Sequence, residues 1–119
     1  MKTILIVEDV DLNVDLLVQL LEDDYNLLVA NDGVEGVRMA EQDQPDLILM
    51  DISLPNMDGY TAALNIHKIH PGIPIIALSA NAMPEDAEKA RFAGFNDYLT
   101  KPINEDALFQ SILEHLGER

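Results

Sequence analysis

Leu47-Ile48-Leu49-Met50-Asp51 is a run of four apolar residues that ends in a single carboxylate. Pro45-Asp46 precedes this run and Pro55 follows shortly after it, so turn residues bound it on both sides. A short, continuously apolar segment between turn signals is typical of a strand that is buried on both faces. Asp51 is therefore expected where a buried strand leaves the core. A lone carboxylate at that place is most simply a turn residue, so its meaning depends on what gathers around it.

Further strand-like segments recur along the chain, at residues 4–7, 27–30, 75–78 and 97–100. Helical patterns separate them. Val14, Leu17, Val18 and Leu21 form one apolar face, for which Asp11 or Asn13 is the expected cap. Later helices are expected over residues 34–40, after Gly59, from Pro84 to Gly94, and through Leu108, Ile112 and Leu116 with Asn104 as the cap. This alternation predicts one three-layer α/β/α domain over residues 1–119, with a parallel sheet covered on both faces.

Composition narrows the class of protein. The 119 residues carry 7 Lys+Arg and 22 Asp+Glu, a formal charge of -15. The electrostatic field of a protein with this negative charge repels nucleic acid phosphates and favours the binding of divalent cations and of partners with basic surfaces. There is no Cys, so no disulfide and no thiolate metal site can form. No apolar stretch approaches the roughly 20 residues of a membrane helix, and the N-terminus lacks a signal-peptide layout. A cytoplasmic location without membrane contact is the default expectation.

Polar side chains follow most of the predicted strands at the point where each strand ends. Glu8 and Asp9 follow the first strand, Asp51 ends the third, Ser79 follows the fourth and Lys101 follows the fifth. Ligands of open α/β sheets bind outside the carboxyl ends of the strands, where the strand order reverses. If the order is 2-1-3-4-5, the first and third strands are neighbours and their carboxylates share one crevice.

Three carboxylates in one crevice should gain proton affinity unless a cation lies between them. Because these positions offer only oxygen ligands, the set favours a hard, hydrated ion such as Mg²⁺ over zinc. Lys101 would add a compact positive charge, and the Ser79 hydroxyl could donate to a phosphoryl oxygen. Asp51 is then the candidate nucleophile for an aspartyl phosphate.

The same residues carry a family resemblance. The order Glu8-Asp9, Asp51, Ser79, Lys101-Pro102, with Leu54-Pro55-x-Met57-Asp58-Gly59 after the candidate nucleophile, closely resembles the receiver domain of two-component response regulators. The resemblance covers the whole chain. The chain is similar in kind to stand-alone, single-domain receivers of the chemotaxis type. It implies a flavodoxin-like (βα)5 fold with a five-stranded parallel sheet. The strand order 2-1-3-4-5 is the order of known receivers, and it rests on the resemblance alone.

By this resemblance, Asp51 accepts a phosphoryl group from a sensor histidine kinase or a histidine phosphotransfer protein. Asp9 is implied to bind Mg²⁺ directly and Glu8 partly through water, and the main-chain carbonyl of Ser53 completes the protein ligands. The implied protein is a phosphorelay signalling switch and not an enzyme, although it helps to catalyse its own phosphorylation and dephosphorylation.

The resemblance also implies switch and structural positions. Ser79 and Tyr98 are the switch pair: the hydroxyl moves to the phosphoryl group and the aromatic ring turns inward. The Lys101-Pro102 peptide is expected to be cis, which would aim Lys101 at the site. From the turn pattern itself, Gly59 is expected to allow a backbone conformation that other residues resist.

In such a switch, the surface formed by the fourth helix, fifth strand and fifth helix would change on phosphorylation and signal to a target protein. That surface is expected to include Ala87, Ala90, Arg91, Phe95, Tyr98 and residues 104–107. A downstream protein would bind there, and the chain is expected to be a monomer or weak dimer.

Two other functions compete with this one. A phosphohydrolase of the haloacid dehalogenase type also uses an Asp nucleophile, but it generally needs a second acid two residues later, where this chain has Ser53. A pseudo-receiver would bind a partner without phosphorylation, although all of the expected chemical residues are present here.

Overall fold

Five strands alternate with five helices in the computed structural model, which describes residues 1–81 and 83–117. The strands are β1 (Thr3–Val7), β2 (Asn26–Ala30), β3 (Leu47–Asp51), β4 (Ile75–Ser79) and β5 (Asp97–Thr100). The helices are α1 (Asp11–Leu21), α2 (Gly33–Asp43), α3 (Gly59–Ile69), α4 (Pro84–Phe92) and α5 (Glu105–Leu116). The strands form one parallel sheet in the order β2-β1-β3-β4-β5, which confirms the predicted order.

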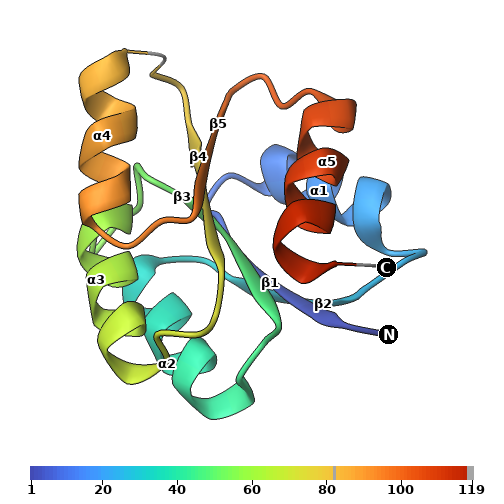
Figure 1. The fold of residues 1–119 in the computed structure, drawn as a ribbon. Coiled ribbons are helices and arrows are strands. Elements are labelled where there is room, and N and C mark those ends of the chain that lie inside the picture. The colour runs from blue at the N-terminus through green and yellow to red at the C-terminus, as the bar shows by residue number, and fades with distance from the viewer. Residues whose placement is uncertain (82, 118–119) are drawn as a thin grey trace.

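The sheet lies between two layers of helices, with α2, α3 and α4 on one face and α1 and α5 on the other (Figure 1). A cluster of buried apolar residues fills the space between the sheet and each layer. Alternate residues of β3 serve both layers: Leu47 and Leu49 pack with residues of α1 and α5, whereas Ile48 and Met50 pack with residues of α2, α3 and α4. This alternation follows from the two-residue period of a strand. Because both faces are covered, all five residues of β3 are buried, as its continuous apolar run predicted.

The helix starts are capped where short polar side chains precede them. Asp32 caps α2, Asp58 caps α3 and Asn104 caps α5, each by accepting a backbone N–H three residues further on. The predicted cap of α1 is wrong, because the helix begins at Asp11 after Val10, which has no side chain able to cap. Gly94 follows α4 with a φ of 99°, a left-handed conformation that glycine adopts without strain.

Two residues predicted for the exposed output surface lie in the core. Ala90 is 1% exposed and Phe95 is 5% exposed, because both pack against the layer formed by α2, α3 and α4. The exposed part of α4 and β5 is therefore smaller than predicted. Among the described helices, none is long and apolar enough to cross a membrane.

Candidate functional site

The predicted site residues lie together at one end of the sheet, where the parallel strands have their carboxyl ends. In the pairing of β1 with β3, Val7 lies opposite Met50, so Glu8 and Asp51 are the next residues along two adjacent strands. In the pairing of β4 with β5, Ser79 lies opposite Thr100, so Lys101 follows at the same level. The strand order thus brings together side chains that are far apart in sequence.

Lys101 bridges two of the carboxylates. Its Nζ lies 2.9 Å from Glu8 Oε1 and 3.2 Å from Asp51 Oδ2. Burial alone would lower the pKa of the Lys101 amine, but the hydrogen bond to Glu8 and the charge of Asp51 outweigh it and raise that pKa above its ordinary value. Lys101 therefore holds its charge at the centre of the site, as a counter-charge to both acids.

Glu8 is completely buried, and both of its carboxylate oxygens have partners. Oε1 accepts from Lys101, while Oε2 accepts the backbone N–H groups of Asp9 at 2.9 Å and Val10 at 3.2 Å. Burial would raise the pKa of Glu8, but the Lys101 hydrogen bond and the Val10 N–H outweigh it, so the pKa lies below its ordinary value. Glu8 is thus a charged residue kept in the interior by its hydrogen bonds.

Asp51 has the opposite balance. Its residue is 5% exposed, and its Oδ1 accepts the Ser53 N–H at 3.2 Å. Burial, followed by the negative charge of Glu8, raises the pKa of Asp51 above its ordinary value, although Lys101 and the Ser53 N–H act in the other direction. The charged form of Asp51 is therefore less stabilised by its surroundings than the charged form of Glu8.

The three acids fit a hard cation. Glu8, Asp9 and Asp51 each offer a carboxylate oxygen, and these oxygens all lie within 4.8 Å of one another. Oxygen ligands in such a group suit Mg²⁺, which takes one or two carboxylates and keeps several waters. Both oxygens of Glu8 are held by Lys101 and by two backbone N–H groups, whereas Asp9 is exposed, so Asp9 is better placed than Glu8 for direct contact with an ion.

Gly59 lies against the backbone of Asp51. The position needs glycine because of this close contact and not because of the unusual backbone conformation that was predicted. Its φ is not in the left-handed region, since Gly94 and Gly117 are the described glycines with positive φ. Instead, a Cβ at position 59 would lie 2.5 Å from the Asp51 carbonyl oxygen and 2.7 Å from the Ile52 Cα. The glycine is needed because the start of α3 approaches the backbone of Asp51 and Ile52 too closely for a side chain.

The two predicted switch residues share one partner. Ser79 Oγ accepts the Asn81 N–H at 3.1 Å, and the Tyr98 hydroxyl donates to the Asn81 carbonyl at 2.5 Å. Ser79 is buried and Tyr98 is half-buried against the core. The structure therefore links the end of β4 to β5 through Asn81, a residue that the sequence did not mark as a link between them.

The Lys101-Pro102 peptide bond is cis, the geometry that the resemblance implied. The backbone N–H of Lys101 donates to the Ser79 carbonyl at 2.7 Å, which ties the start of this loop to the end of β4. Ser53 lies two residues after Asp51 and is exposed. Its carbonyl as a metal ligand stays a prediction.

One hydrogen bond between the loops near the site could not be predicted from the sequence. Asp32 fits an ordinary turn by its local pattern, but its Oδ2 accepts from Asn56 Nδ2 at 2.8 Å while its Oδ1 caps α2. Asn56 has a φ of 67°, a left-handed conformation in which Asn is enriched. The signal was present as an Asn in a turn cluster, yet its partner lies 24 residues away and no local pattern indicates it.

Comparison with known families gives one match over most of the chain. The model of the response regulator receiver domain matches residues 4–113. The polar-differentiation response regulator DivK of Brucella ovis is 38% identical over 120 residues, and the match covers 98% of each chain. The transcriptional regulatory protein GlrR of Escherichia coli K12 is 35% identical over 100 residues, covering 84% of this chain but 22% of GlrR. The chain thus spans about a fifth of that longer relative.

Solved structures agree with this assignment. The receiver domain of the sensor histidine kinase PA1611 of Pseudomonas aeruginosa PAO1, solved with a magnesium ion in its active site cleft, is 38% identical with a TM-score of 0.91 and 98% coverage of both chains. The receiver domain of Ssk1 from Saccharomyces cerevisiae, crystallised with the histidine phosphotransfer protein Ypd1, is 33% identical with a TM-score of 0.89. It covers 95% of this chain and 87% of that one.

Proposed function

We propose, since this chain belongs to the response regulator receiver domain family, that Asp51 is the residue that accepts the phosphoryl group. The observation that carries the proposal is the contact of Lys101 with both Asp51 and Glu8 at the end of the sheet. A buried carboxylate with a fixed cation beside it is suited to receive a group of high negative charge. The two further acids nearby would hold a divalent cation that offsets the same charge.

In the proposed step, a carboxylate oxygen of Asp51 attacks the phosphorus of a phosphohistidine. A new O–P bond forms and the N–P bond breaks, and the leaving imidazole keeps the electron pair and takes up a proton from solvent. Lys101 offsets the negative charge of the phosphoryl oxygens, and the Ser79 hydroxyl gives up its Asn81 contact to donate to one of them. The chain positions these groups and so assists both the gain and the loss of the phosphoryl group.

Mg²⁺ is the proposed cofactor. Asp9, Asp51 and the Ser53 carbonyl would hold it, with Glu8 acting through water because its own oxygens are occupied. When bound, the ion supplies positive charge that offsets the phosphoryl oxygens. The magnesium ion in the related PA1611 receiver domain supports this choice.

The proposed phosphodonor is a sensor histidine kinase or a histidine phosphotransfer protein, as the co-crystal of the related Ssk1 receiver with Ypd1 suggests. The proposed output surface lies on α4, β5 and α5. A groove of about 400 Å³ there includes the exposed Ala87 and Arg91 and the half-buried Tyr98. A downstream protein would bind at this groove with an affinity that depends on the position of Tyr98. Monomeric or weakly dimeric behaviour and a cytoplasmic location remain predictions.

The test is phosphorylation by a small donor. Incubation with Mg²⁺ and acetyl phosphate or phosphoramidate is expected to add the mass of one phosphoryl group, and chelation of the metal is expected to prevent it. Asp51→Asn should abolish the gain. Asp46→Asn is the matched control, because Asp46 is an exposed carboxylate at the opposite end of the same strand. A phosphoryl group that persists in the Asp51→Asn protein would overturn the assignment.

A further inference from the structure

A second concave surface lies on the face of the molecule covered by α1 and α5. The α1–α5 groove has a volume of about 990 Å³ and is lined by residues from the end of α1, the turn after it and α5 between Glu105 and Glu114. Its described lining residues include none from the site around Asp51. The groove therefore needs an explanation of its own.

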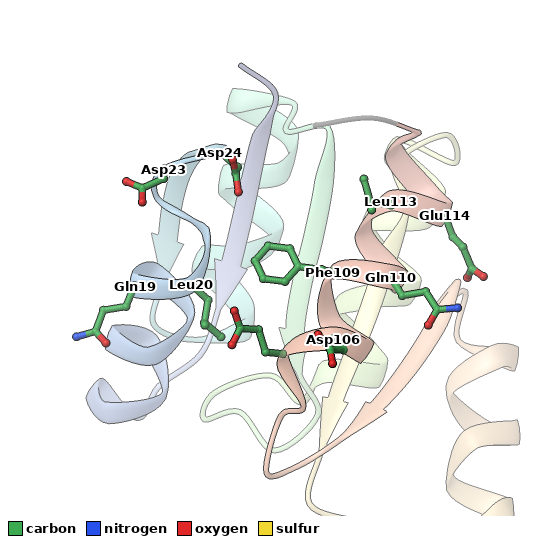
Figure 2. A pocket seen from close by; sticks show the side chains of 10 residues that line it. Gln19, Leu20, Asp23, Asp24, Asp106, Phe109, Gln110, Leu113 and Glu114 are labelled. Carbon is green, nitrogen blue, oxygen red and sulfur yellow. The ribbon is translucent and has the colours of Figure 1, made fainter.

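The floor of the α1–α5 groove is apolar. Figure 2 shows Phe109 reaching from α5 toward α1, with Leu20 opposite it and Leu113 further along α5. Leu113 is 36% exposed, and Leu20 and Phe109 are partly buried against the core. Apolar side chains that face water in a hollow between two helices gain free energy when another apolar surface covers them.

The rim of the groove is acidic. Its carboxylates are Asp23, Asp24, Glu105, Asp106 and Glu114, and no Lys, Arg or His is among the described residues that line the groove. In Figure 2 the labelled members lie at both sides of the floor, Asp23 and Asp24 after α1 and Asp106 and Glu114 on α5. The groove thus combines an apolar floor with a rim of one charge sign.

Charge decides which occupant fits this rim. A second copy of the chain would bring further carboxylates against these, because the formal charge of each copy is -15. Nucleic acid and anionic lipid are disfavoured for the same reason. A segment with positive charges beside apolar anchors complements both the rim and the floor.

The secondary structure of the occupant follows from the groove walls. Within the described parts of the chain, only side chains of two helices and the turn between α1 and β2 line it, so it offers no strand edge to which an extended peptide could pair. An amphipathic helix laid in a groove contributes anchors at positions i, i+3, i+4 and i+7. We propose that the α1–α5 groove binds a basic amphipathic helix of a partner protein, with its apolar residues on Leu20, Phe109 and Leu113 and its Lys or Arg residues on the rim.

The test uses a synthetic peptide as the probe. It carries leucines at i, i+3, i+4 and i+7 on one helical face and lysines on the other, and its affinity is measured by calorimetry and its contact residues by amide chemical shifts. Two control peptides replace the leucines by serine or the lysines by glutamate. All measurements can be repeated in the Asp51→Asn protein, since binding is expected to be independent of phosphorylation and of the proposed acceptor.

Two pairs of matched variants separate the groove from general charge. The triple variant Asp23→Asn, Asp106→Asn, Glu114→Gln should weaken binding by about tenfold. Its control, Glu41→Gln, Asp43→Asn, Glu85→Gln, removes the same charge from exposed sites on α2 and α4 and should have little effect. Leu113→Asn should weaken binding by about fivefold, whereas Leu64→Asn should not, although this leucine of α3 is 44% exposed and Leu113 is 36% exposed.

Several results would overturn the proposal. Equal weakening by the two triple variants would show that only net charge attracts the peptide. Equal binding of the serine peptide would show that the apolar floor contributes nothing. Shift changes centred away from α1 and α5, or stronger binding to vesicles of anionic lipid than to the lysine peptide, would also contradict it. The expected outcome is shift changes at the groove that only the amphipathic lysine peptide produces.

Discussion

The two helices that flank the site are held very differently. On one flank, α3 buries Gly59, Ala62, Ala63 and Ile66, and Asp58 caps its start. On the other flank, α4 buries Ala90 alone among residues 84–92, and Met83 before it makes no side-chain cap. The loop after β3 is also tied to the next loop through Asn56 and Asp32, whereas the described contacts of the loop after β4 run through Asn81.

This difference suggests separate roles for α3 and α4. A nucleophile needs a fixed position, because small misplacements reduce the rate of a transfer reaction strongly. A switch needs an element whose two positions differ little in free energy, so that a new charge can shift the balance. We infer that the α3 flank fixes Asp51 and that the α4 flank is the part that responds. Each of the following experiments tests one side of this comparison.

Gly59→Ala should have the largest effect. The new Cβ would meet backbone atoms of Asp51 and Ile52 at 2.5 and 2.7 Å, and backbone cannot turn away as a side chain can. Overpacking should lower the free energy of unfolding by about 1–3 kcal/mol, more than the gain in helix propensity returns at a helix start. Urea denaturation measures the change. Gly72→Ala is the control, since a Cβ there meets nothing within 4 Å; an equal loss in both variants would contradict the explanation.

Asn56→Ala should have the next largest effect. It removes the hydrogen bond to Asp32 and places alanine at a φ of 67°. The expected loss of unfolding free energy is about 1–2 kcal/mol, from the strained backbone and the lost bond together. Asn56→Gly removes the same bond but suits the backbone, so it should cost less. A loss for glycine as large as for alanine would mean that the hydrogen bond alone matters.

Lys89→Met tests the weaker flank. Lys89 Nζ lies 4.3 Å from the centre of the Tyr60 ring, a contact that joins α4 to α3. Because the site is exposed, the loss in unfolding free energy should be only about 0.5 kcal/mol, while amide exchange should accelerate within α4 and not within α3. Lys68→Met on α3 is the matched control. Faster exchange throughout α3 would contradict the division between the flanks.

Acidic pH should act on the α3 flank and only slightly. The pKa of Asp58 lies below its ordinary value, because the Thr61 N–H and hydroxyl donate to its carboxylate. A group with a lowered pKa in the folded state stabilises above its unfolded pKa of about 3.9 and loses this as the pH falls through the folded value. The Thr61 amide shift should therefore titrate with a midpoint below the ordinary pKa of an aspartate. In Asp58→Asn this titration should vanish; a midpoint at or above the ordinary value would exclude the capping explanation.

Much of this structure could be predicted because its signals are local. The apolar run at Leu47–Met50 predicted a buried strand, and Asn104 and Gly94 predicted the bounds of two helices. The convergence of Glu8, Asp51 and Lys101 followed from a rule about strand ends once the strand order was assumed. The order itself came from a family resemblance.

The missed features depend on distances between segments. No local pattern shows that Gly59 lies against the Asp51 backbone or that Asp32 reaches Asn56, because these contacts exist only after α2 and α3 pack on the sheet. Ala90 was misplaced for a related reason, because a short helix with little periodicity does not reveal which side faces the core. Phe95 lies in the connection between α4 and β5, where no periodic pattern indicates burial. The cap of α1 was wrong because the helix starts at the first of the candidate residues.

The contact between Lys101 and Glu8 joins residues 93 positions apart in the chain. A nascent chain on the ribosome therefore has the strand β3, with Asp51 at its end, long before it has the cation beside that strand. Under the proposed function, a chain that stops before β5, or that is clipped within it, keeps Asp51 but lacks the means to become a competent acceptor. Phosphorylation would then mark only molecules that have been synthesised at least as far as Lys101 and have folded, and copies truncated before that residue would not take phosphoryl groups from the pathway.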